Sequence, residues 1–214
     1  MLKDEKIQLI NKFKKNGIIK SKEVEKAFLK IPREKFVPYE YYHNAYIDTP
    51  LKIGFNQTIS APHMVAIMAE ALDIRKGQKI LEIGTGSGYH VAIVSKLVGE
   101  KGYVYSIERF TKLAKKAEEN IKKIKIKNIK IEIGDGSKGL KKNSPYDRIY
   151  FTCAAPGISD IIVNQLKIKG KLLIPVGKTV CNLILLEKNE NEIKKYNLGG
   201  CAFVPLIGEL GHKK

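Results

Sequence analysis

The chain of 214 residues contains no tryptophan, four histidines and three cysteines, and this scarcity limits the metal and redox chemistry that it can carry. The cysteines, Cys153, Cys181 and Cys201, are far apart, odd in number and form no Cys-x-x-Cys pair. Neither a zinc site nor a disulfide framework is therefore indicated. We expect no bound metal and three small, buried thiols in a reducing cytoplasm.

Long apolar segments and a secretion signal are also missing. No apolar run approaches the roughly 20 residues that span a bilayer. The first five residues include two acids and no apolar block follows them, which is unlike a signal peptide. The sequence therefore predicts a cytoplasmic protein without membrane contact. Its 43% of hydrophobic residues suffices for one well-buried α/β domain.

Arginine is scarce although the chain is strongly basic. Only four of the 39 basic residues are arginines, and the formal net charge is +17. Proteins that read nucleic-acid bases often use arginine for bidentate contacts, whereas a lysine-rich surface often serves solubility. We therefore favour a basic surface without a nucleic-acid partner, and we expect a monomer.

Hydrophobic periodicity predicts two helices at the start of the chain, over 3–16 and from Ser21, as N-cap, to Pro32. The segment 36–59 has prolines, a cluster of tyrosines and no clear period, and it is interpreted as an ordered irregular connection. We expect residues 1–60 to form a helical, substrate-side appendage on a core of residues 61–214, within one structural domain.

From residue 61 onward, predicted helices and strands alternate. Such alternation is typical of an α/β fold with a doubly wound, mostly parallel sheet, and we expect about seven strands. The predicted helices cover 61–73, 89–98, 111–123 and 158–166, and the predicted strands cover 79–83, 102–107, 129–133, 147–151, 171–176, 182–188 and 202–206.

A glycine-rich turn follows the first of these strands. Residues 81–89 read Leu-Glu-Ile-Gly-Thr-Gly-Ser-Gly-Tyr. Glycines let the backbone approach a ligand closely, and the start of the next helix offers free N–H groups. Tyr89 stands where a dinucleotide-binding turn needs Gly or Ala, so an oxidoreductase is disfavoured. The pattern is instead Gly84-x-Gly86-x-Gly88, preceded by Glu82.

Acidic residues end the next two strands. A carboxylate at Glu108 suits the two hydroxyls of a ribose, and Asp135, flanked by glycines, can accept from an adenine amine. Alone, Glu108 also fits a solvated acid and Asp135 an ordinary turn. Because all three motifs are expected at the carboxyl edge of the sheet and no phosphate-binding Gly-x-x-x-x-Gly-Lys loop is present, their order predicts an adenosine site without a pyrophosphate.

The segment Gln57–Met64 lies upstream of the glycine turn. Ser60 is a suitable N-cap and Pro62 suits the first turn of a helix, which is a purely structural role. A helix start of this kind also binds anions through its free N–H groups. We hypothesise that Ser60 and its neighbours hold a substrate carboxylate.

Together these motifs resemble the Rossmann-like methyltransferases that use S-adenosylmethionine (AdoMet), and more closely the protein-L-isoaspartate (D-aspartate) O-methyltransferase family. The resemblance covers nearly the whole chain and includes 57–64, 82–90, 105–109, 134–136, 145–149, 152–156, 170–177 and 203–206. The chain departs from the family pattern at Cys153, at Ala202, where many relatives carry Arg, and in its basic charge. None of these departures touches the cofactor motifs.

The resemblance implies protein repair by transfer of the AdoMet methyl group to the free α-carboxylate of L-isoaspartyl residues, and of D-aspartyl residues, in damaged proteins and peptides. S-adenosyl-L-homocysteine is the product. Ser60 is then the catalytic residue that holds the carboxylate. Cofactor-binding residues are Ile59, Glu82, Gly84, Thr85, Gly86, Ser87, Gly88, Glu108, Arg109, Gly134, Asp135 and Gly136, and substrate-binding residues are Thr58, Ser60, His63, Val204 and Ile207. A local hydrogen bond would explain His63 equally well.

Two alternatives stay open at this point. The basic charge permits an RNA or DNA methyltransferase, although no Asn-Pro-Pro-Tyr type motif is present. The second alternative is a non-catalytic AdoMet- or nucleotide-binding regulator. Such a protein needs only the cofactor pocket, so the presence of the Ser60–His63 segment disfavours it.

Overall fold

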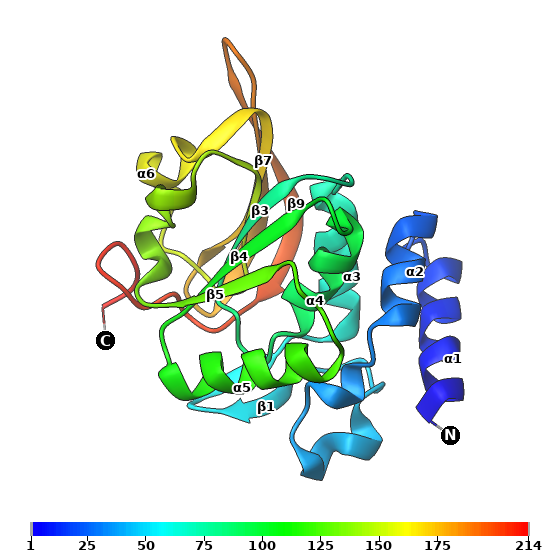
Figure 1. Cartoon of the computed structure of the whole chain (residues 1–214). Coiled ribbons are helices and arrows are strands. Elements are labelled where there is room, and N and C mark those ends of the chain that lie inside the picture. The colour runs from blue at the N-terminus through cyan, green and yellow to red at the C-terminus, as the bar shows by residue number, and fades with distance from the viewer. Residues whose placement is uncertain (1, 214) are drawn as a thin grey trace.

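The computed structural model describes residues 2–213, and the chain begins with two helices that lie side by side on one flank of the molecule (Figure 1). They are α1 (Leu2–Lys15) and α2 (Lys22–Lys30). The Ser21 hydroxyl accepts a hydrogen bond from the Val24 N–H at 3.2 Å, which confirms the predicted N-cap of α2.

A seven-stranded sheet forms the centre of the molecule, with the order β5-β4-β3-β6-β7-β8-β9. The strands from β5 to β7 are parallel, while β8 and β9 are antiparallel to their neighbours. This confirms the doubly wound, mostly parallel sheet. The strands are β3 (Lys79–Ile83), β4 (Tyr103–Glu108), β5 (Ile129–Ile133), β6 (Tyr146–Phe151), β7 (Leu166–Gly177), β8 (Val180–Lys188) and β9 (Ile193–Ala202).

The strand order reverses between β3 and β6. In open α/β sheets the crevice at such a reversal, outside the carboxyl ends of the strands, is where ligands bind. The fold thus brings the ends of β3, β4, β5 and β6 to one edge, as the sequence predicted for its glycine-rich and acidic motifs.

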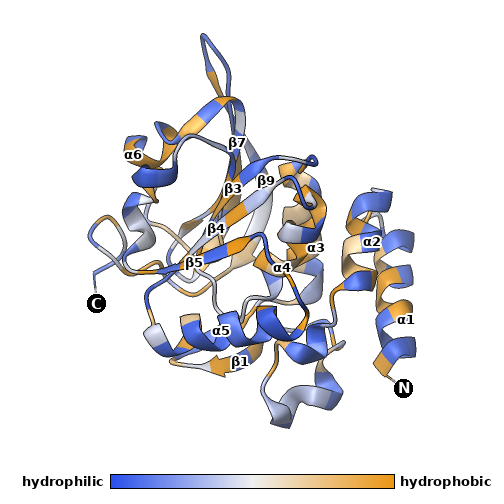
Figure 2. Ribbon diagram, viewed as in Figure 1, coloured by the Kyte–Doolittle hydropathy of each residue, from blue (hydrophilic) through white to orange (hydrophobic). Residues whose placement is uncertain are grey.

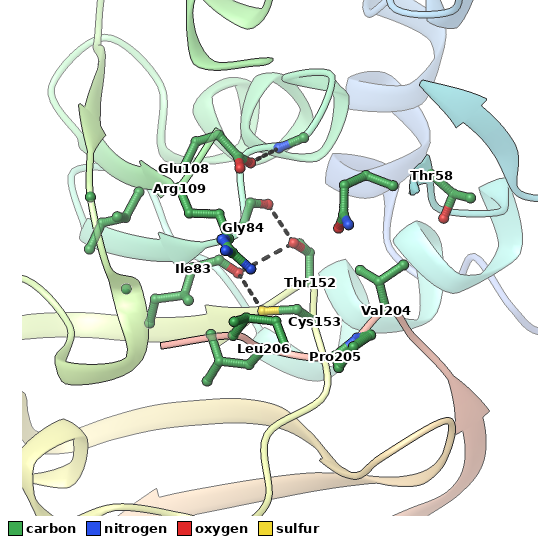
Figure 3. Close-up of a pocket in the computed structure, with 16 residues that line it drawn as sticks. Thr58, Ile83, Gly84, Glu108, Arg109, Thr152, Cys153, Val204, Pro205 and Leu206 are labelled. Carbon is green, nitrogen blue, oxygen red and sulfur yellow. Dashed lines mark hydrogen bonds between the residues drawn. The ribbon is translucent and has the colours of Figure 1, made fainter. Parts of the chain in front are cut away.

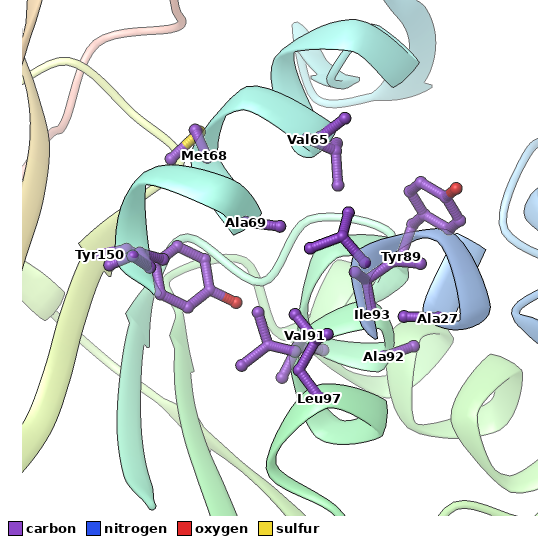
Figure 4. Close-up of a cluster of buried hydrophobic side chains, with 14 of the residues drawn as sticks. Ala27, Val65, Met68, Ala69, Tyr89, Val91, Ala92, Ile93, Leu97 and Tyr150 are labelled. Carbon is purple, nitrogen blue, oxygen red and sulfur yellow. The ribbon is translucent and has the colours of Figure 1, made fainter. Parts of the chain in front are cut away.

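Helices cover both faces of the sheet. On one face lie α3 (Pro62–Leu72), α4 (Tyr89–Val98) and α5 (Thr111–Lys123), while the short α6 (Asp160–Val163) packs on the other. Side chains alternate between the two faces, so Ile80 of β3 joins the cluster with α3 and α4, whereas Leu81 and Ile83 join the cluster with α6. Figure 4 shows the first cluster, and Figure 2 shows that polar residues dominate the outward face of α5.

The N-terminal helices share this core. Phe13, Val24 and Phe28 are buried in the same cluster as α3 and α4, and the Phe28 ring meets the Tyr89 ring edge-on with centroids 6.4 Å apart. The packing of the appendage is therefore continuous with the core, while a domain boundary at residue 60 stays a prediction.

The last strand differs from its prediction. A strand was expected over 202–206, but β9 spans Ile193–Ala202 and pairs with β8 through a turn in which Asn189 N–H donates to Glu192 O at 2.9 Å. Residues 193–200 are all exposed, so β9 lacks the apolar alternation that reveals a strand. The resulting hairpin projects from the body (Figure 1). Beyond β9, Pro205 makes only an isolated bridge with Ala154.

Two other elements also differ from expectation. The helix predicted over 158–166 is the four-residue α6, and β7 begins at Leu166 rather than at residue 171. The segment 36–59 contains a 3-10 helix, Tyr39–Asn44, and a hairpin of β1 (Leu51–Gly54) and β2 (Gln57–Ile59). Its turn residues Phe55 and Asn56 both have positive φ, 53° and 56°, as a two-residue hairpin turn requires. The turn lacks the usual Asn-Gly signal, which is why it was missed.

Within residues 2–213 no helix has the length and apolarity to cross a membrane. In the same range, no group of three or more His, Cys, Asp or Glu side chains is arranged to hold a metal ion.

Candidate active site

Three adjoining hollows lie where the central strands end. The strand-end hollow is lined by residues at the ends of β3, β4, β5 and β6 and by residues 204–207 (Figure 3). The Ser60 hollow lies between the start of α3 and residues 200–204, and the connecting hollow lies between Ser60 and the glycine turn. Thr58 and Thr152 line all three, so the hollows form one continuous site.

Most of the predicted site residues meet here. The predicted residues that line the strand-end hollow are Thr58, Gly84, Gly86, Glu108, Arg109, Gly134, Gly136, Val204 and Ile207. Ser60 and His63 line the Ser60 hollow, and Ile59, Thr85 and Ser87 line the connecting hollow. Three predicted residues, Glu82, Gly88 and Asp135, line none of these three hollows.

The glycine turn has a backbone conformation that would be strained for any residue other than glycine. Gly84, Gly86 and Gly88 have φ of 98°, 54° and 88°, in the left-handed region that favours glycine. A Cβ on Gly84 would also collide with the Thr152 hydroxyl, and one on Gly88 would lie 3.2 Å from Ala117 Cβ. Gly88 therefore serves the close packing of α4 on α5, while Gly84 and Gly86 face the site.

Glu108 joins the glycine turn to the end of β4. Its Oε2 accepts a hydrogen bond from Gly86 N–H at 2.9 Å, and its Oε1 accepts one from Phe110 N–H at 3.0 Å. The side chain is buried yet borders the strand-end hollow. A carboxylate has about four acceptor positions, so the two that remain can accept from a ligand with two adjacent hydroxyls.

Glu82 is fully buried behind the glycine turn rather than inside a hollow. Its carboxyl accepts hydrogen bonds from the hydroxyls of Ser106 at 2.5 Å and Tyr150 at 2.7 Å, and the Ser106 hydroxyl is 2.6 Å from that of Thr85. Burial raises the pKa of Glu82 to about 8, against the effect of its hydroxyl partners. The network braces the turn from below, and Glu82 is largely protonated at neutral pH.

This raised pKa makes stability depend on pH. Between pH about 4.5 and 8 the folded state holds a proton on Glu82 that the unfolded chain releases, so the free energy of unfolding falls as pH rises. We expect Glu82→Gln, which keeps the shape and does not ionise, to remove part of this fall, on the order of a few kcal/mol. Urea unfolding of both proteins between pH 5 and 8 measures it. Identical slopes for the two proteins would contradict the raised pKa.

The Asp135 carboxylate is engaged by the C-terminal segment. Its Oδ1 accepts from Ser137 N–H at 2.8 Å and its Oδ2 accepts from Glu209 N–H at 2.7 Å. A Cβ on Gly208 would collide with the same carboxylate. Asp135 therefore fixes residues 208–209 against the end of β5, and its neighbours Gly134 and Gly136 line the strand-end hollow instead.

The start of α3 differs from its prediction in a way that matters for Ser60. The N-cap is Ala61, which makes no side-chain cap hydrogen bond, so Ser60 does not cap the helix. Asp48 does so from a distance: its Oδ1 accepts from both the N–H and Nδ1 of His63, each at 2.9 Å. In the described part of the chain, the Ser60 hydroxyl has no hydrogen-bond partner. It is thus free to bind a ligand, while Pro62 and His63 offer no free N–H.

Arg33 supports the segment that carries Asp48. This fully buried side chain donates from Nε to Ala45 O at 2.8 Å, and its guanidinium carbon lies 5.1 Å from the centre of the Tyr89 ring. Burial lowers the pKa of Arg33 to about 10, so the side chain stays charged at neutral pH. It links residues 45–49 to Tyr89 at the start of α4, and Tyr89 lines the connecting hollow.

Among the described residues that line the connecting hollow, none is a strong enough base to remove a proton near pH 7. His90 lines it, and burial lowers the pKa of this imidazole to about 3, so His90 is neutral near pH 7. Any substrate group that reacts here must already be ionised or must lose its proton to water.

Sequence reasoning missed several residues of the site. Thr152 lies at its centre, and its hydroxyl donates to Gly84 O (Figure 3). Beside the site, Phe55 in the turn of the β1–β2 hairpin stacks on Phe110 with ring centroids 5.1 Å apart, and the guanidinium carbon of Arg109 lies 4.8 Å from the centre of the Phe110 ring. Thr152 could have been predicted, because it directly follows strand β6 and therefore lies at the carboxyl edge of the sheet. Asp48 and Phe55 had no such signal, because their partners are distant and the segment 36–59 lacks a period.

The comparisons with known proteins agree on one family. The model of the "Protein-L-isoaspartate(D-aspartate) O-methyltransferase (PCMT)" family matches residues 4–211. The protein-L-isoaspartate O-methyltransferase of Methanococcus aeolicus is 52% identical over 195 residues, which are 91% of this chain and 90% of that protein.

Two solved structures extend this similarity to the fold. A protein-L-isoaspartate O-methyltransferase superposes with a TM-score of 0.86 and 32% identity, covering 96% of this chain and 67% of the other. A putative protein-L-isoaspartate O-methyltransferase from Plasmodium falciparum, in complex with S-adenosyl-L-homocysteine, has a TM-score of 0.82 and 29% identity over 94% of this chain and 97% of its own.

Proposed function

Because the chain belongs to the protein-L-isoaspartate(D-aspartate) O-methyltransferase family, we propose how its three hollows carry out the reaction of that family. The protein is an AdoMet-dependent methyltransferase that repairs proteins by methylating isoaspartyl residues. The assignment of individual residues to the cofactor and the substrate is our proposal, and the continuity of the strand-end, connecting and Ser60 hollows is the observation that carries it.

The strand-end hollow fits the adenosine part of AdoMet. The two free acceptor positions of Glu108 suit the ribose hydroxyls, and Ile83, Ile107 and Leu206 give the hollow apolar walls for a flat base. The glycine turn brings bare backbone to the other side. Further contacts are assigned to Ile59, Thr85, Ser87, Arg109 and the backbone of Gly134–Gly136. Three predicted residues support the site without contacting the cofactor. Glu82 stabilises the glycine turn, Gly88 allows the close packing of α4 on α5, and Asp135 holds the C-terminal segment.

The Ser60 hollow fits the substrate carboxylate. The Ser60 hydroxyl is half-buried and has no protein partner among the described residues, so it can donate to a carboxylate oxygen. Thr58, His63 and Val204 line the same hollow, and Ile207 lies beside it on the strand-end side. Asp48 holds His63, which keeps the start of α3 in place while Ser60 binds.

The residues need to supply position rather than proton transfer. AdoMet supplies an electrophilic methyl group when it is bound. The isoaspartyl α-carboxylate is ionised at neutral pH and is itself the nucleophile, which agrees with a connecting hollow whose histidine, His90, is neutral. Ser60 and Thr58 hold one carboxylate oxygen toward the connecting hollow. The walls of that hollow keep this oxygen aligned with the methyl group. Such orientation is worth several kcal/mol of the barrier.

The substrates are isoaspartyl-containing peptides and damaged proteins, as the family implies. We further propose that the protein acts as a monomer in the cytoplasm and that it accepts D-aspartyl residues as well. Three unpaired cysteines support a reducing compartment.

Methyl transfer to matched peptides tests the assignment. Two peptides with the same sequence, one with L-isoaspartyl and one with L-aspartyl at the same position, are incubated with methyl-labelled AdoMet. We expect base-labile label on the isoaspartyl peptide only. Equal labelling of both peptides would contradict the repair function. In a parallel incubation with tRNA, label on the RNA and none on the peptides would favour a nucleic-acid methyltransferase.

A further inference from the structure

Two of the three cysteines are neighbours in the fold although 20 positions separate them in the sequence. Cys181 of β8 and Cys201 of β9 are direct partners in the antiparallel ladder. Opposite residues of such a ladder have Cα atoms about 4.5 to 5.5 Å apart, and this lies within the usual Cα separation of a disulfide, about 4.4 to 6.8 Å.

Their side chains lie on the same face of the sheet. Cys181 is buried in the core cluster that includes α3 and α4, and Cys201 packs against that same cluster while remaining partly exposed. Burial, and to a smaller extent the proximity of Cys181, raises the pKa of Cys201 to about 11. Cys153 is the remaining cysteine, and its Sγ lies 3.7 Å from Ile83 O, on the other core cluster.

Cys201 is also reachable from outside. It lines the Ser60 hollow with Gly200, Ala202 and Phe203, and strand β9 is the exposed edge of the sheet. A small-molecule disulfide can therefore reach the sulfur of Cys201 through the hollow. The buried Cys181 lies directly opposite Cys201, so its thiol can attack a mixed disulfide formed there.

We propose that Cys181 and Cys201 are a modification site, at which oxidation forms an intramolecular, cross-strand disulfide in the wall of the Ser60 hollow. The thiolate of Cys201 attacks a small-molecule disulfide such as oxidised glutathione, and one glutathione thiol leaves. The Cys181 thiolate then attacks the mixed disulfide and releases the second glutathione thiol. Two protein thiols lose two protons and two electrons, and one glutathione disulfide becomes two thiols, so the exchange balances.

The raised pKa of Cys201 limits the rate at which this disulfide forms. Because only the thiolate attacks, the bond forms slowly at neutral pH and faster at alkaline pH. The closed loop joins the protruding β8–β9 hairpin at its base, so the oxidised protein is expected to be the more stable form, with a melting temperature about 5 to 10 °C higher.

Oxidation of the whole protein tests this proposal, and the test needs no methyltransferase activity. The protein is treated with oxidised glutathione at pH 8.5, digested, and mapped by mass spectrometry, and free thiols are titrated under denaturing conditions. We expect a cross-linked peptide pair that contains Cys181 and Cys201, with the mass of two hydrogen atoms missing, and a fall from three free thiols to one. Dithiothreitol should restore all three.

Matched variants separate this pair from other thiol chemistry. Cys153→Ala should still form the cross-link, whereas Cys181→Ser and Cys201→Ser should not, and neither of these should gain the rise in melting temperature. A stable glutathione adduct on Cys201 of the unmutated protein, a disulfide that includes Cys153, or a cross-link between two chains would each overturn the proposal.

Discussion

Glu108→Ala is expected to weaken AdoMet binding by about two orders of magnitude. The change removes the acceptors for two ribose hydroxyls, and each hydrogen bond to a charged group contributes about 1.5 to 3 kcal/mol. It also frees Gly86 N–H and Phe110 N–H, which Glu108 holds at 2.9 and 3.0 Å, so the glycine turn loses part of its support. Isothermal calorimetry with AdoMet or S-adenosyl-L-homocysteine measures the affinity directly.

Two further variants make this result specific. Glu119→Ala removes the same charge from the exposed face of α5, where Glu119 pairs with Lys116, and it should bind AdoMet as the unmutated protein does. Glu108→Gln keeps one acceptor oxygen and should fall between the two. If Glu108→Ala kept its AdoMet dissociation constant, Glu108 would have no part in holding the ribose.

Ser60→Ala is expected to show the opposite pattern. The rate of methylation of an isoaspartyl peptide, as kcat/KM, should fall about tenfold to a hundredfold, because one hydrogen bond to a carboxylate is lost at the point of reaction. AdoMet affinity should change little. The fold should also survive, since Ala61 is the N-cap of α3 and Asp48 supplies the capping carboxylate.

The control for Ser60 is a serine at the opposite edge of the sheet. Ser144 precedes β6 and lines none of the three hollows, and its hydroxyl donates to Lys141 O at 2.8 Å, so Ser144→Ala should methylate peptides normally. Loss of AdoMet binding in Ser60→Ala would move Ser60 from the substrate to the cofactor. Full activity in that variant would remove it from the site.

The elements that sequence predicted well are those whose signals are local. The strands β3 and β4 end in short buried runs, and the glycine turn must have positive φ at Gly84, Gly86 and Gly88, so spacing alone placed them at the carboxyl edge. Glu108 could be placed for the same reason. Its position at a strand end, and not its neighbours, determines where its carboxylate lies.

The features that sequence could not predict depend on contacts between distant segments. Asp48 caps α3 from 15 positions away, so the nearer Ser60 took its place in the prediction. Strand β9 forms only because β8 offers an edge, and its exposed residues give no apolar period. Glu82 was expected at the ligand because it precedes the glycine turn, yet it lies in the core, where two hydroxyls donate to its carboxyl and burial raises its pKa.

The most direct test of the account is a crystal structure of the protein with S-adenosyl-L-homocysteine and an isoaspartyl peptide. We predict the ribose hydroxyls on Glu108, the base between residues 134–136 and 204–207, and the peptide α-carboxylate on the Ser60 hydroxyl with its oxygen directed through the connecting hollow at the cofactor sulfur. A peptide carboxylate bound away from Ser60, or an adenosine outside the strand-end hollow, would contradict it.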